Sequence, residues 1–109
     1  MIVKTNLAAC YIKIGDAGNS IRNAKEALAL NPQAWKSTIR LAEAQVLAKN
    51  YEKAITTCEK ALTLIPAAET DPSAKGAITT VASIKKSAIA LLKAEEQKQK
   101  ESFKNIFKS

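Results

Sequence analysis

Histidine is absent from this sequence of 109 residues, and cysteine occurs only twice, as Cys10 and Cys58. The two cysteines form no CxxC pair and no cluster with other ligand types, so we expect neither a metal site nor a cofactor. Both occupy apolar positions of helical patterns, which predicts buried free thiols in a reducing compartment. The chain also has no nucleophile–base pair and no glycine-rich phosphate loop, so we expect no enzymatic activity.

Long apolar runs, glycine, proline and aromatic residues are also scarce. No apolar run approaches the ~18 residues of a membrane-spanning helix, and Lys4, Thr5 and Asn6 interrupt the first apolar stretch too early for a signal peptide. We therefore expect no transmembrane segment and a cytoplasmic or nuclear location. With 5% aromatic residues, three glycines, three prolines and abundant alanine, the composition favours packed helices within at most one domain.

Acidic residues are fewer than basic ones, and the imbalance is local. Residues 1–72 carry nine basic and seven acidic residues, whereas residues 73–109 carry eight basic and three acidic residues. Such a basic excess occurs in proteins that bind nucleic acid, anionic membranes or acidic proteins, and equally on solvated helix faces. No aromatic stacking platform accompanies the basic residues, so we expect no nucleic-acid partner.

The sequence does contain an internal repeat. The stretches NAKEALALNPQAW and TCEKALTLIPAAE are related, and four pairs of residues lie 34 positions apart: Leu7 and Leu41, Ala8 and Ala42, Ala27 and Ala61, Pro32 and Pro66. A period of 34, with small residues where helices cross and proline after the second helix, is typical of a helix–turn–helix unit. On these residues the chain resembles tetratricopeptide repeat proteins.

The resemblance implies an all-α fold, a right-handed α-solenoid of two tetratricopeptide hairpins followed by a long helix. We expect three parts, namely a first repeat over residues 1–34, a second repeat over residues 35–68, and a loop, long C-terminal helix and basic tail over residues 69–109. The expected helices cover about residues 2–14, 17–30, 33–48 and 51–65, and run from Ser73 to at least Lys100 after a loop over 66–72.

Short signals mark the helix ends. Gly15 predicts a left-handed stop, and Asp16 and Asn50 predict N-caps. In the long helix we expect one buried stripe, made of Ala77, Val81, Ile84, Ala88 and Leu91, with Ile78 and Leu92 beside it. Beyond Leu92 the sequence KAEEQKQKES is polar, so we expect this part to project beyond the body or to stay mobile.

Asn6, Lys36 and Arg40 form the candidate binding site. Asn6 lies in the first helix of its repeat, whose residues line the concave surface of such solenoids. Lys36 and Arg40 are four residues apart on one face of the equivalent helix in the next repeat. A carboxamide and two cations should therefore converge on one groove, which suits a carboxylate ligand. The alternative is that Lys36 and Arg40 are solvated charges and that Asn6 is a cap.

This spacing is similar to that of co-chaperones with a carboxylate clamp. The resemblance implies that Asn6, Lys36 and Arg40 occupy three of the five clamp positions, while a lysine and an asparagine would come from a preceding repeat. The implied partner is the acidic C-terminal peptide, ending Glu-Glu-Val-Asp, of heat shock protein 90 or 70 chaperones. The stretches NLAACYIKIG and FKNIF further resemble large immunophilins, the FK506-binding or cyclophilin-type prolyl isomerases. That likeness implies the C-terminal part of such an isomerase, without its catalytic domain.

Two further interactions stay open at this point. The tail combines lysines with bulky apolar side chains, as targets of calmodulin or of anionic membranes do, although a solubilising helix end has the same composition. The tail residues concerned are Lys98, Lys100, Phe103, Lys104, Ile106 and Phe107. The first helix carries apolar residues that a neighbouring repeat would cover and that, if exposed, favour a homodimer: Ile2, Val3, Leu7, Tyr11, Ile12 and Ile14.

Overall fold

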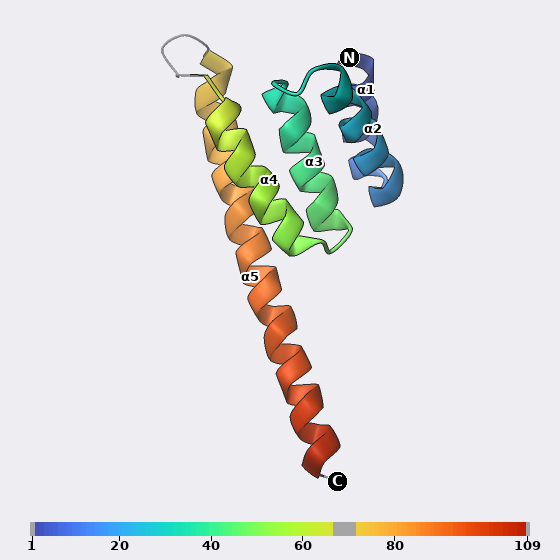
Figure 1. Cartoon of the computed structure of the whole chain (residues 1–109), viewed down its shortest axis with the longest axis vertical. Helices are drawn as coiled ribbons and strands as arrows, with labels where there is room; N and C mark the ends of the chain where they lie inside the picture. Colours follow the sequence, from blue (N-terminus) through green and yellow to red (C-terminus); the bar gives the residue numbers. More distant parts are fainter. Residues whose placement is uncertain (1, 67–71, 109) are drawn as a thin grey trace.

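The computed structural model describes residues 2–66 and 72–108, with side chains over 4–66 and 72–106. Five helices make up this part of the chain: α1 (Ile2–Lys13), α2 (Ala17–Leu30), α3 (Trp35–Leu47), α4 (Tyr51–Leu64) and α5 (Pro72–Lys108). Consecutive helices pack against one another, and α1 and α3 also touch, as do α3 and α5. The predicted all-α fold of two hairpins and a long helix is thus confirmed, and Figure 1 shows α5 running along α4 and continuing beyond it.

Small side chains allow the helices of each hairpin to approach closely. Ala24, Ala27, Ala54 and Ala61 are fully buried. Ser20, where the repeat pattern favours a smaller residue, is also fully buried, and its hydroxyl donates a hydrogen bond of 2.8 Å to the carbonyl oxygen of Ala8. This bond compensates for burying a hydroxyl group, so serine is tolerated at the crossing of α1 and α2.

The start of α3 lies two residues later than the predicted start at residue 33. The side-chain oxygen of Asn31 accepts a hydrogen bond from the backbone N–H of Gln33, and the Ala34 N–H donates to the Asn31 carbonyl. Residues 31–34 therefore form a turn of their own, which delays the helix until Trp35. The predicted loop over 66–72 falls mostly on residues 67–71, outside the described residues, and Pro72 is already the first residue of α5.

The two hairpin turns have similar backbones built from different residues. Gly15 has φ 81°, as predicted for a left-handed stop, and the Asp16 side chain caps α2 by accepting from the Asn19 N–H at 3.1 Å. In the second turn Lys49 has φ 65°. Asn50 is the N-cap residue of α4, as predicted, although its side chain makes no cap hydrogen bond.

The packed face of α5 is rotated slightly from the predicted stripe. Ala74, Ala77, Val81 and Ala88 are buried, whereas Leu91 and Ile78 are each 42% exposed and Leu92 is half-buried instead. The reason is that α5 contacts α4 along most of the packed length and α3 only briefly, so a narrower face is covered. All side chains over residues 93–106 are exposed, and this half of α5 projects from the body (Figure 1).

Candidate functional site

The three predicted site residues line one cavity. Asn6 comes from α1, and Lys36 and Arg40 come from the first half of α3. The cavity has a volume of about 450 Å³, and α5 closes its far side with Ser73, Ala77 and Thr80. Its size lies in the range of small-ligand sites. The structure therefore brings the predicted amide and the two predicted cations to a common groove between α1, α3 and α5.

A hydrogen bond between neighbouring side chains holds α1 and α3 in register at this groove. The hydroxyls of Thr5 and Ser37 lie 2.7 Å apart. Each is the chain neighbour of a predicted site residue, Asn6 on α1 and Lys36 on α3, and Ser37 is only 1% exposed. Because a buried hydroxyl is costly without a partner, this bond favours the alignment that places Asn6 beside Lys36.

The two cations differ in their surroundings. The Lys36 ammonium lies 5.4 Å from the centroid of the Trp35 ring, within the range of a cation–π contact, and among the described residues it pairs with no carboxylate. Arg40 instead donates from Nη1 to Glu43 Oε1 at 3.0 Å. Glu43 also lines the cavity. Of the residues that the structure describes, two cations and one carboxylate line the groove, and the sequence did not predict Glu43 there.

A second cavity adjoins the first and shares Trp35 with it. It has a volume of about 480 Å³ and is lined by Thr5, Asn6, Asn31, Gln33, Ala34, Trp35, Lys36 and Ser37. Thr5, Asn6, Trp35 and Lys36 belong to both cavities. The Asn31 turn that delays α3 forms one wall here, so the shift in the start of α3 also shapes the groove.

The predicted tail residues lie on the projecting half of α5. Lys98, Lys100 and Lys104 are exposed, Phe103 is 63% exposed and Ile106 is 69% exposed. The side chain of Phe107 lies outside the described residues. On the first helix, Leu7 and the following Ile14 are 38% and 73% exposed, while Ile2 and Val3 lie outside the described side chains.

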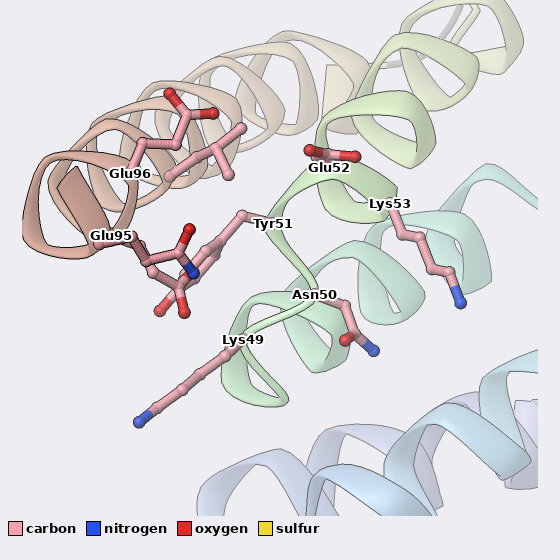
Figure 2. Close-up of a pocket in the computed structure, with 9 residues that line it drawn as sticks. Lys49, Asn50, Tyr51, Glu52, Lys53, Glu95 and Glu96 are labelled. Atoms are coloured by element: carbon pink, nitrogen blue, oxygen red, sulfur yellow. The ribbon is translucent and has the colours of Figure 1, made fainter. Parts of the chain in front are cut away.

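A further cavity, which the sequence did not predict, lies where α5 leaves the body. It has a volume of about 420 Å³ and is lined by Lys49, Asn50, Tyr51, Glu52, Lys53, Leu92, Glu95, Glu96 and Gln99. Figure 2 shows the Tyr51 side chain directed toward α5, beside Glu95. Both lysine and glutamate side chains line it. Its walls come from the start of α4 and the middle of α5. The sequence did not predict this cavity, because it forms only through the packing of α5 beside α4.

The cysteines correct one prediction. Cys58 is fully buried, but Cys10 on α1 is exposed. Burial raises the pKa of the Cys58 thiol to about 11; nearby Lys85 lowers it and Glu59 raises it by smaller amounts.

Over residues 2–66 and 72–108 no cluster of three potential metal ligands occurs. Nor is any helix in these ranges long and apolar enough to cross a membrane.

Comparison with known proteins gives one match. A family model for the tetratricopeptide repeat matches residues 3–34 and 37–67, which together make up more than half of the chain. No curated protein matches, and no solved structure does. The two matched segments correspond to the α1–α2 and α3–α4 hairpins.

Proposed function

Because the chain belongs to the tetratricopeptide repeat family, whose hairpins serve as protein–protein interaction modules, we propose that it binds an acidic C-terminal peptide. The partner that we propose is a heat shock protein 90 or 70 chaperone, whose C-terminus reads Glu-Glu-Val-Asp. The chain acts here as a non-enzymatic co-chaperone module in the cytoplasm or nucleus. The likeness of NLAACYIKIG and FKNIF to large immunophilins supports a parent protein that is a prolyl isomerase.

One observation carries this proposal, namely that Asn6, Lys36 and Arg40 line the same cavity. A carboxamide N–H, an ammonium and a guanidinium are donors, and two of them are charged. Hydrogen bonds from charged donors to a carboxylate are shorter and stronger than neutral ones. We propose that the terminal carboxylate binds Asn6 and Lys36 and that acidic side chains of the same peptide contact Arg40.

Alanine substitutions at the two cations test the proposal. Lys36→Ala removes a charge-assisted hydrogen bond worth ~1.5–3 kcal/mol, so we expect the affinity for a Glu-Glu-Val-Asp peptide to fall about 10- to 150-fold. Arg40→Ala weakens binding as well. Isothermal titration calorimetry measures both effects, and circular dichroism verifies that each variant is folded.

Matched controls distinguish a local contact from a general loss of positive charge. Lys60 on α4 and Arg22 on α2 are exposed and line neither cavity of the groove. Lys60→Ala and Arg22→Ala should therefore leave the peptide affinity within about twofold, because distant exposed charges are screened by salt. If Lys36→Ala and Lys60→Ala bind the peptide equally well, the groove is not the site.

The exposed tail supports a second candidate function, binding to calmodulin or a similar acidic partner. Residues 93–106 are exposed throughout, and four lysines there accompany the apolar side chains of Phe103 and Ile106. Basic helices with bulky apolar anchors are typical calmodulin targets. Titration with calcium-loaded calmodulin should show binding to the full chain and none to a chain ending at Lys93. Equal binding by both chains would exclude the tail.

A further inference from the structure

Among the described residues, Glu43 is the one carboxylate that lines the cavity of Asn6, Lys36 and Arg40. Its Oε1 accepts a hydrogen bond of 3.0 Å from Nη1 of Arg40, one turn earlier on α3. The Glu43 side chain is only 24% exposed and that of Arg40 is 41% exposed. This ion pair therefore lies against the groove and is partly shielded from water.

The pair changes the charge that a ligand meets. Lys36 pairs with no carboxylate in the described chain, so it is available to an incoming anion. Arg40 already satisfies Glu43, and a second carboxylate at Arg40 either displaces Glu43 or lies beside it. Displacement breaks an existing ion pair, and lying beside it places two like charges in contact, so both outcomes cost free energy.

We propose that Glu43 is an intramolecular competitor for Arg40, which lowers, without abolishing, the contribution of Arg40 to binding peptides that bring carboxylates besides the terminal one. Lys36 and Asn6 bind the terminal carboxylate whatever residues precede it. Glu43 determines how much free energy is lost when acidic side chains upstream of that carboxylate approach Arg40. Glu43 is thus a specificity-determining residue of the groove. This inference rests on the proposed function, because it concerns the ligand of the same cavity.

Glu43→Gln tests the inference, because glutamine keeps the shape of the side chain and removes its charge. We expect the variant to bind a peptide ending Glu-Glu-Val-Asp about two- to fivefold more tightly than the original chain, since a partly exposed ion pair contributes at most about 1 kcal/mol. A peptide ending Gln-Gln-Val-Asn keeps only the terminal carboxylate. Its affinity should change less than about twofold, because no side chain competes with Glu43.

Glu59→Gln is the matched control. Glu59 on α4 pairs with Lys85 at 3.6 Å and does not line the groove, yet its substitution raises the net charge by the same amount. It should leave the affinity for both peptides unchanged. If Glu43→Gln behaves like Glu59→Gln toward the acidic peptide, Glu43 is an ordinary helix-surface charge and the inference is wrong.

The same titrations separate this inference from the proposed function. Binding that depends on Lys36 but not on Glu43 overturns the competitor role and leaves the proposed function intact. No binding of either peptide by the original chain or by Glu43→Gln overturns both. If only Glu43→Gln binds the acidic peptide, both are supported. Competition by Glu43 for Arg40 then costs enough free energy to prevent measurable binding by the original chain.

Discussion

The two thiols show how position on a helix, rather than residue type, determines reactivity. Cys58 lies in the core with Ile39, Ala61 and Val81, and its pKa of about 11 follows mainly from desolvation. Cys10 is exposed on α1. The sequence predicted burial of both, because apolar periodicity identifies a helix face without showing whether a neighbouring element covers it.

We therefore expect one fast-reacting thiol per chain. At pH 8 a thiol with a pKa of about 11 is thiolate in only about one molecule in a thousand, and burial blocks the reagent as well. A chromogenic disulfide reagent should modify Cys10 within minutes and Cys58 only after unfolding in urea. Cys10→Ser should remove the fast reaction. Two fast thiols in the folded chain would show that the packing around Cys58 opens readily.

The candidate site shows what a repeat period predicts and what it leaves open. The spacing of 34 residues and the helical period together predicted that Asn6, Lys36 and Arg40 share a groove, because both fix the direction of a side chain from its number alone. Glu43 is three residues from Arg40 and was still missed. A flexible charged side chain reaches either solvent or a neighbour, and periodicity does not decide between them. The identity of the peptide partner stays a prediction.

At the scale of elements, the two hairpin turns use one hydrogen-bond pattern. The N–H of Gly15 donates to Ile12 and that of Asp16 to Tyr11; in the second turn Lys49 donates to Val46 and Asn50 to Gln45. Gln45 lies 34 positions after Tyr11, so the second repeat lacks the aromatic side chain of the first. Gln45 is buried and accepts a hydrogen bond of 2.6 Å from the Thr57 hydroxyl, so a polar link between α3 and α4 replaces aromatic packing.

Glycine suits the left-handed position of these turns, whereas lysine is strained there. Gly15→Ala should lower the free energy of unfolding by about 1 kcal/mol, and Lys49→Gly should raise it by up to about 1 kcal/mol, because only glycine adopts positive φ without a steric cost. Urea denaturation measures both values. Gly76→Ala within α5 is the control: nothing lies within 4 Å of the added Cβ, so it should stabilise by about 0.5–1 kcal/mol. Changes of the same sign for Gly15→Ala and Gly76→Ala would contradict this account.

Helix ends were predicted less accurately than helices. α1, α2 and α4 begin and end within one residue of the prediction, because glycine, proline and capping residues mark them. The predicted start of α3 was wrong by two residues, because the Asn31 side chain stabilises a separate turn before the helix that the sequence pattern did not predict. α5 extends to Lys108, farther than the minimum at Lys100.

At the scale of the whole molecule, the chain is elongated, with principal extents of 59 × 29 × 21 Å. The body consists of the two hairpins and the first half of α5, and the second half of α5 extends away from it (Figure 1). The polar sequence after Leu92 predicted that α5 has a packed first half and a projecting second half. The direction of the projecting half, and the cavity that it forms with Tyr51, depend on the packing angle between α4 and α5, which sequence periodicity does not encode.

A chain shortened to end at Lys93 should keep the stability of the body. No side chain over residues 93–106 is buried, so their removal exposes little apolar surface. We expect the melting temperature to fall by less than about 4 °C, which corresponds to less than about 1 kcal/mol for a domain of this size, and the peptide affinity to stay unchanged.

Val81→Ala is the contrasting variant, because Val81 is 1% exposed in the packed half of α5 and its truncation should cost about 2 kcal/mol. Thermal circular dichroism compares the three chains. A shortened chain that melts as early as Val81→Ala, or without cooperativity, would mean that the projecting half of α5 stabilises the body through contacts with the start of α4.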